Sequence, residues 1–193
     1  MSTKDALLIV DVQNDFCPNG ALGVKDGDQV VPILNEWARR ISAAGGLVVA
    51  TRDWHPRETA HFKELGGVWP VHCVQNTTGA AFHPELQLPA GAVVVSKGLD
   101  PKADGYSAFE AADEAGRPLA EILRERGVEH LYVGGLATDY CVKCSALDAL
   151  RQGFDVTVIE EGIRGVDLQP GDSERALGEM RAAGAKIAAA AAR

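Results

Sequence analysis

Residues 130–153 read HLYVGGLATDYCVKCSALDALRQG, and this stretch decides the fold class. Its first part, 130–135, is a short apolar run of the kind that forms a strand buried on both faces. A tight turn follows, and the residues from about 140 to 152 form a helical segment that ends at Gly153. The next apolar run, FDVTVI at 154–159, begins directly afterwards. A strand, a helix and a second strand in close succession predict parallel strands joined by a helical crossover.

The same alternation runs along the rest of the chain. Further apolar runs that predict strands are ALLIV (6–10), LVVAT (47–51), AVVVS (92–96) and AKIAA (185–189). Helices are predicted over 30–41, before Gly45 and Gly46, between Pro118 and Gly127, and over 173–183. The sequence therefore predicts a single α/β domain over residues 1–193, a doubly wound sheet of about six mostly parallel strands with helices on both faces.

Composition limits the classes of partner. The chain has 193 residues, 46% of them hydrophobic and 24% charged, as in ordinary globular proteins. Its formal net charge of -8, with no basic patch to offset it, argues against a nucleic-acid partner. The apolar run near the N-terminus is too short for a signal peptide or a membrane span, so we expect a cytoplasmic protein without a membrane partner. The cysteines at 17, 73, 141 and 144 are accordingly expected to be free thiols.

In a doubly wound sheet, ligands bind beyond the carboxyl ends of the strands, near the point where strand order reverses. The residues at these ends are Asp11, Asp53, Lys97 and the run 136–141. Two acids, a lysine and a cysteine are thus expected to converge on one crevice. Such a set predicts a catalytic site at the crevice rather than residues that only pack in the core.

Cys141 is predicted to begin a helix, where unpaired backbone N–H groups and the positive helix end favour the thiolate. The same amides can hold an oxyanion formed on a substrate carbonyl. The alternative is an inert buried thiol, the commoner state of cysteine. Cys144 lies one helical turn further on, and no second cysteine pair is available for a structural zinc site. We therefore interpret Cys144 as a packing residue.

Asp11 and Lys97 each have an ordinary alternative. An aspartate after a strand is often a turn or cap residue, and most lysines are exposed. Near a thiol, however, Asp11 could act as the base that activates it, provided that burial raises its pKa. Lys97 ends an apolar strand, so it should be partly buried beside an anionic neighbour. Asp11 is the natural partner, with the Cys141 thiolate as the second.

A candidate metal site follows the second strand. The segment TRDWHPRETAHF (51–62) holds Asp53, His55 and His61, and WPVHCV (69–74) adds His72. Imidazoles together with a carboxylate suit zinc, iron or manganese, although any single histidine is more often a loop residue.

Position in the chain also indicates a role for four further residues with ring side chains. His83 precedes a proline and His130 enters a strand, so both are interpreted as structural. Phe16 and Trp69 lie in loops near the proposed base and the last proposed ligand. They are candidates for the walls of a planar pocket.

Taken together, these motifs resemble the nicotinamidases of the isochorismatase-like cysteine hydrolase superfamily. The matching segments are DVQNDF (11–16), DWHP (53–56), WPVHCVQNTTGA (69–80), SKG (96–98) and GLATDYCVKCSALDA (135–149). They occur in the family's order and span most of the chain. The resemblance implies one hydrolase domain that converts nicotinamide, and in some members pyrazinamide, to the acid and ammonia through a thioester on the cysteine.

The resemblance also implies roles for individual residues. The catalytic triad would be Asp11, Lys97 and Cys141, the metal ligands Asp53, His55 and His72 with water, and His61 a further ligand found in some members. The preferred metal would be zinc, with iron or manganese as alternatives. It would orient the pyridine ring between Phe16 and Trp69. A cis peptide at Leu136–Ala137 would turn the Ala137 and Cys141 amides into an oxyanion hole. Cys144 matches a position without a catalytic role.

Two rival functions remain open at this point. Another amidohydrolase of the superfamily, acting on a small carbamoyl compound or an open-chain amide, would share the triad without needing the metal set. A metal-dependent or thiol-redox binding protein would show no amide hydrolysis at all. The sequence is also compatible with a homo-oligomer.

Overall fold

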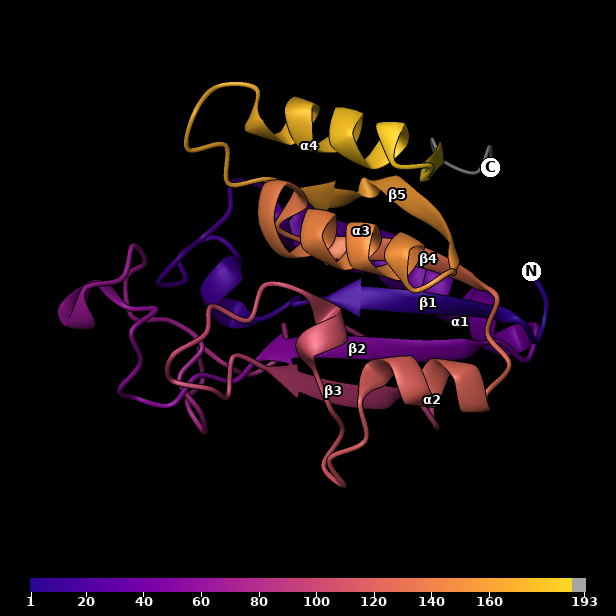
Figure 1. Ribbon diagram of the computed structural model, residues 1–193, viewed down its shortest axis with the longest axis horizontal. Helices are drawn as coiled ribbons and strands as arrows, with labels where there is room; N and C mark the ends of the chain where they lie inside the picture. Colours follow the sequence, from indigo (N-terminus) through magenta and orange to yellow (C-terminus); the bar gives the residue numbers. More distant parts are fainter. Residues whose placement is uncertain (189–193) are drawn as a thin grey trace.

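The computed structural model describes residues 1–188, and its centre is one six-stranded sheet (Figure 1). The strands are β1 (Asp5–Val10), β2 (Leu47–Asp53), β3 (Val93–Lys97), β4 (His130–Leu136), β5 (Asp155–Arg164) and β6 (Lys186–Ala188). Their order is β3-β2-β1-β4-β5-β6, and every neighbouring pair is parallel. The predicted doubly wound α/β fold is confirmed. Ala189, the last residue of the sixth predicted strand, lies outside the described residues.

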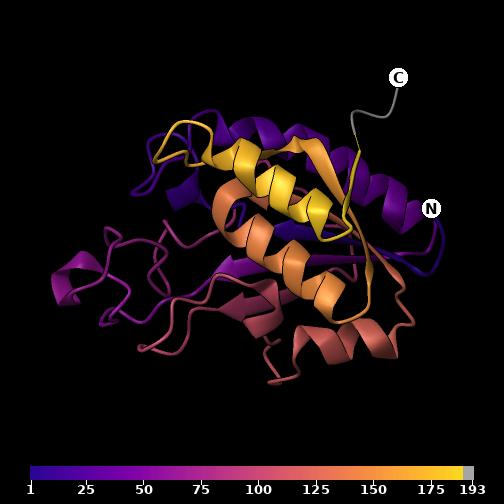
Figure 2. The ribbon, with the colours of Figure 1, turned by 45° about the horizontal axis from the view of Figure 1, so that its top comes forward.

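Helices cover both faces of the sheet, as predicted (Figures 1 and 2). The helices are α1 (Val30–Ala43), α2 (Leu119–Glu125), α3 (Lys143–Arg151) and α4 (Asp172–Ala182). In Figure 2, α1 lies behind the sheet, whereas α2, α3 and α4 lie in front of it. Short helical turns at Asn14–Phe16, Gly27–Gln29, Lys63–Leu65 and Ala108–Glu110 interrupt the loops.

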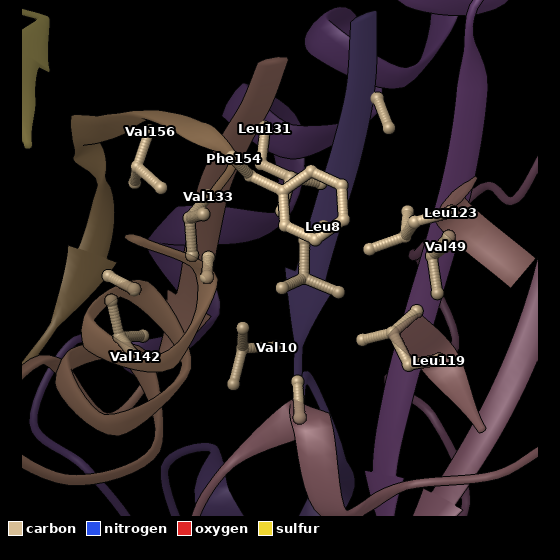
Figure 3. Close-up of a cluster of buried hydrophobic side chains, with 14 of the residues drawn as sticks. Leu8, Val10, Val49, Leu119, Leu123, Leu131, Val133, Val142, Phe154 and Val156 are labelled. Carbon is tan, nitrogen blue, oxygen red and sulfur yellow. The ribbon is translucent and has the colours of Figure 1, made fainter. Parts of the chain in front are cut away.

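The alternation of side chains along β1 divides the core into two clusters. Leu8 and Val10 belong to one cluster with Leu119 and Leu123 of α2, shown in Figure 3, and with residues of α3. Leu7 and Ile9 point to the opposite face and pack with residues of α1. All four side chains are fully buried, which contributes about 1.5–3 kcal/mol for each large one. Packing on both faces of the sheet therefore holds β1 in place, and with it the start of the segment that follows, at Asp11.

The helix predicted from about residue 140 begins differently. Residues Thr138–Val142 form a π-helical turn, and α3 starts only at Lys143. The amide of Val142 donates to the carbonyl of Ala137, five residues back, at 3.1 Å. This wider turn carries Cys141, and single π-helical turns occur frequently at functional sites.

The strand order reverses between β1 and β4, so the carboxyl ends of these two strands flank a crevice. Asp11 directly follows β1, and Ala137 directly follows β4. Asp53 and Lys97 are the paired last residues of β2 and β3, rather than residues beyond the strands as predicted. The long loops after β1 and β2 gather at this same edge, on the left in Figure 1. Within residues 1–188, no helix is long and apolar enough to cross a membrane.

Candidate active site

Lys97 lies at the centre of the site. Its side chain is fully buried, and its Nζ contacts Asp53 Oδ1. The same ammonium lies 2.7 Å from Asp11 Oδ2, 2.9 Å from the carbonyl oxygen of Gly105 and 3.5 Å from Cys141 Sγ. Burial alone disfavours the charged amine, but Asp11 and Asp53 together raise the pKa of Lys97 well above its ordinary value. The structure places Lys97 beside both expected neighbours, Asp11 and Cys141, and buries it fully rather than partly.

Asp11 is fully buried at the switch point, with a left-handed backbone (φ 49°). Its Oδ1 accepts a hydrogen bond from the Thr51 hydroxyl at 2.6 Å. Its Oδ2 pairs with the Lys97 ammonium at 2.7 Å and has no other partner among residues 1–188. Burial raises the pKa of Asp11 and outweighs the opposing effect of Lys97. The neighbouring ammonium therefore does not prevent this carboxylate from accepting a proton.

Cys141 is 6% exposed and lines a cavity. A carboxylate oxygen of Asp11, one of Asp53 and the sulfur of Cys141 all lie within 4.8 Å of one another. Burial raises the pKa of the thiol well above its ordinary value, and the two carboxylates add to this, while Lys97 opposes it. The direction of this shift opposes the effect expected of the helix terminus, so a neighbouring base would be needed to activate the sulfur.

Three imidazoles lie beside this group. One ring nitrogen from each of His55, His61 and His72 lies within 4.8 Å of the others. The second oxygen of Asp53 lies 3.6 Å from Nε2 of His55 and 3.9 Å from Nε2 of His72. The four predicted metal ligands, including His61, are thus brought together. Asp53 faces both Lys97 and the imidazoles.

The Nδ1 atom of each imidazole lies at hydrogen-bond distance from a protein oxygen. His55 lies 3.1 Å from the carbonyl oxygen of Gly98, His72 lies 2.8 Å from that of Pro70, and His61 lies 2.7 Å from Oδ1 of Asp104. These acceptors assign the proton to Nδ1 and leave Nε2 free, the arrangement that is usual for metal-ligating histidines.

The buried Nε2 of His55 has no hydrogen-bond partner among residues 1–188. Burial also lowers the pKa of His72 to about 4, so its ring is neutral at neutral pH and able to bind a cation. A partnerless buried nitrogen amid imidazoles and one carboxylate fits a divalent metal ion.

A narrow pocket opens beside the thiol. Phe16 and Trp69, the two predicted ring-binding residues, both line it, as does Ala137. The other residues of its wall are Leu22, Asp53, His61, His72, Tyr106, Tyr140, Cys141 and Val166. A flat aromatic ligand would meet apolar walls, imidazoles and the thiol at once.

Two further expectations can be compared with the structure. The Leu136–Ala137 peptide is cis, as the resemblance implied. All four cysteines are free, and Cys144 lies half-buried on α3, whereas Cys141 belongs to the buried cluster with Asp11 and Asp53. A redox dithiol of Cys141 and Cys144, which the rival thiol-redox protein would need, receives no support from this placement.

Two residues that support the site, Gln13 and Asp15, were not predicted from the sequence. The buried amide of Gln13 donates to the carbonyl of Asp53 and accepts from its N–H, both at 2.8 Å. Asp15 accepts from the amide of Cys73 at 2.7 Å and so ties the Phe16 turn to the segment that carries His72. Both lie inside the quoted stretch 11–16, but only the pattern of hydrogen bonds reveals their role.

Comparisons with known proteins agree with this geometry. A family profile described as the isochorismatase domain matches residues 5–192. The chain is 44% identical to a nicotinamidase of Escherichia coli (strain K12), over 94% of this chain and 93% of that protein. It is 41% identical to a nicotinamidase/pyrazinamidase of Mycobacterium tuberculosis (strain ATCC 25618 / H37Rv), over 94% and 97% of the two chains. Among solved structures, the pyrazinamidase of Pyrococcus horikoshii in complex with zinc matches with a TM-score of 0.89 and 48% identity, covering 97% and 99%.

Proposed function

The chain belongs to the isochorismatase domain family and, like its nicotinamidase relatives, is an amidohydrolase; from this premise we propose that it hydrolyses nicotinamide to nicotinate and ammonia through a thioester on Cys141. The observation that carries the proposal is the buried group of Asp11, Lys97 and Cys141 at the edge of an aromatic cavity. The family profile spans residues 5–192, which supports one hydrolase domain over the whole chain.

In the proposed mechanism, Asp11 acts first as a base. Its carboxylate takes the proton of the Cys141 thiol, and the sulfur attacks the carboxamide carbon. Lys97 holds the carboxylate in place and stabilises the thiolate as it forms. Burial raises the pKa of Asp11, which makes its carboxylate a stronger base than that of an ordinary aspartate.

The amides of Ala137 and Cys141 are proposed to hold the oxyanion, a contribution of about 3–4 kcal/mol for a well-placed donor. Asp11 then returns the proton to the departing ammonia, which leaves the nicotinoyl group on the sulfur. Water, deprotonated by Asp11, attacks this thioester, releases nicotinate and restores the thiol. Phe16 and Trp69 would hold the ring on its two faces throughout.

The divalent metal would be held by Asp53, His55 and His72, with His61 as a further ligand. Zinc is the preferred metal, and iron or manganese are the alternatives. When bound, the ion would offer a coordination position to the pyridine nitrogen and so fix the ring's orientation. Zinc is favoured because the related pyrazinamidase was crystallised in complex with zinc.

The direct test is ammonia release from a panel of small amides. We expect nicotinamide to be the preferred substrate, with pyrazinamide also hydrolysed because it presents a similar ring. A preference for open-chain amides or carbamoyl compounds would favour the other amidohydrolase reading. Hydrolysis that survives complete alkylation of the thiols, or that is never found, would remove the cysteine mechanism.

Removing the metal should weaken substrate binding. We expect chelator-treated protein to show a KM for nicotinamide raised by about tenfold or more, equivalent to at least about 1.4 kcal/mol of binding. The reason is that the proposed metal orients the ring while the thiol performs the attack. Steady-state kinetics before chelation, after chelation and after adding back zinc, iron or manganese provide the measurement. An unchanged KM in fully demetallated protein would contradict the role given to Asp53, His55 and His72.

The rate should also depend on pH through Asp11. Because burial raises the pKa of Asp11 above its ordinary 3.8, the carboxylate that acts as base is present only above this raised pKa. Activity should therefore fall with decreasing pH before the ordinary aspartate range is reached. A kcat/KM profile, with circular dichroism at each pH to exclude unfolding, measures this. Full activity down to the ordinary aspartate pKa would contradict it.

A further inference from the structure

Three consecutive residues, Asp104, Gly105 and Tyr106, each contact a different part of the site. Oδ1 of Asp104 lies 2.7 Å from Nδ1 of His61, a residue of the imidazole cluster. The carbonyl of Gly105 accepts from the Lys97 ammonium at 2.9 Å. The Tyr106 hydroxyl accepts from Nε1 of Trp69 at 2.8 Å. One short segment, Asp104–Tyr106, therefore meets the metal-binding, catalytic and ring-binding residues at once.

Close backbone contact fixes where this segment lies. Gly105 has φ +71°, and a Cβ there would lie 2.6 Å from the amide nitrogen of Gly98. Gly98 has φ +69°, and a Cβ there would lie 2.5 Å from Cε1 of the His55 ring. Only glycine fits at either position, because larger residues would meet backbone or a buried ring in a left-handed conformation. The segment thus packs on Gly98, which packs on His55.

Both ends of the segment are held by residues outside the site. Upstream, the carbonyl of Pro101 accepts from the amide of Ala60 at 2.8 Å and from the hydroxyl of Thr59 at 3.2 Å. Downstream, Ser107 and Glu110 form a capping box on the short helical turn, and the amide of Ala108 donates to the buried Ser145 hydroxyl at 2.9 Å. The segment is therefore supported before it meets the site.

We propose that Asp104–Tyr106 is a positioning segment that orients His61, Lys97 and Trp69 together, an inference that rests on the function proposed above. Asp104, by accepting the Nδ1 proton, turns Nε2 of His61 toward His55 and His72 and so makes His61 a fourth protein ligand in this chain. Tyr106 fixes the plane of the Trp69 indole and thereby selects flat rings. Gly105 supplies the neutral acceptor that completes the ammonium's shell between two carboxylates.

The first test uses the metal alone. Loss of such a partner behind a ligating histidine weakens metal affinity by about 10–100-fold, and we expect this range for Asp104→Ala. The measurement is a zinc competition titration with a chromophoric chelator, which needs no substrate. Asp104→Asn keeps an acceptor oxygen and should retain most of the affinity. Lys102→Ala, an exposed residue of the same loop, is the matched control and should bind zinc as the wild type does.

The second test separates ring binding from chemistry. Tyr106→Phe leaves the Trp69 N–H without its acceptor, and we expect a rise of about two- to twelvefold in KM for nicotinamide. The kcat and the zinc affinity should stay within about twofold of wild type. Tyr132→Phe removes a hydroxyl beside Trp37, away from the site, and should leave KM unchanged.

The outcomes distinguish this inference from the proposed function. If the wild type hydrolyses nicotinamide but Asp104→Ala keeps its zinc affinity, or Tyr106→Phe keeps its KM, the positioning role is wrong and the function stands. If the wild type does not hydrolyse nicotinamide, the proposed function fails, whereas the zinc titration still decides the role of Asp104. An equal loss of zinc affinity and kcat in both variants would indicate general misfolding and would also overturn the inference.

Discussion

Replacing Cys141 by alanine is expected to abolish ammonia release from nicotinamide, with a fall in kcat of about 10⁴-fold or more. The substitution removes the sulfur that Asp11 and Lys97 surround, and no other thiol belongs to that buried cluster within the described residues. The cavity walls remain, so nicotinamide should still bind. Ammonia detection measures the first effect, and isothermal titration with nicotinamide measures the second.

Cys144→Ala is the matched control for this experiment. The residue lies three positions along the chain, half-buried on α3, and should leave kcat nearly unchanged. A comparable loss of activity in both variants would revive the dithiol interpretation of the two cysteines. Loss of nicotinamide binding in Cys141→Ala would instead show that the thiol is needed to hold the substrate.

Lys97→Met is expected to cost both activity and stability. The lysine is buried between Asp11 and Asp53, so its removal leaves two carboxylates without their shared cation. Breaking a buried pair in this way typically lowers the free energy of unfolding by about 3–5 kcal/mol. Urea unfolding of chelator-treated protein measures this change, since metal binding at Asp53 is then equal in all variants. The ammonia assay should show no turnover.

A double variant tests the cause of the instability. Asp11→Asn/Lys97→Met removes one of the two charges together with the cation, so part of the lost stability should return while activity stays absent. Lys102→Met, at an exposed position of the neighbouring loop, should leave the free energy of unfolding within about 0.5 kcal/mol of wild type. If the double variant were no more stable than Lys97→Met, the loss would have to come from packing rather than charge.

The sheet could be predicted from sequence because its central strands are buried on both faces. Such strands are continuous apolar runs, and each of the six was located to within a few residues, apart from the longer β5. The strand order was not predicted, since pairing depends on contacts between runs that are far apart in sequence. The π-helical turn at Thr138–Val142 was missed because its apolar spacing resembles that of an ordinary helix.

The residues of the candidate site could be grouped from the sequence because parallel strands place their carboxyl ends at one edge. Asp11, Lys97 and Cys141 could be grouped on that argument alone. The raised pKa of the Cys141 thiol could not be predicted, because it depends on burial beside two carboxylates rather than on its place at a helix start. Likewise, Tyr106 gave no sign in the sequence of its bond to Trp69, since the two residues lie on separate loops.

The single ammonium group of Lys97 touches the segment after β1, the end of β2 and the sulfur in the turn after β4. These segments are distant along the chain and meet only once the central strands have paired. A nascent or partly unfolded chain therefore carries Cys141 as an ordinary thiol, without Asp11 and Lys97 beside it. The surroundings of the thiol form only when the sheet is complete. A ligand that binds only this assembled site stabilises the whole sheet against unfolding rather than one loop.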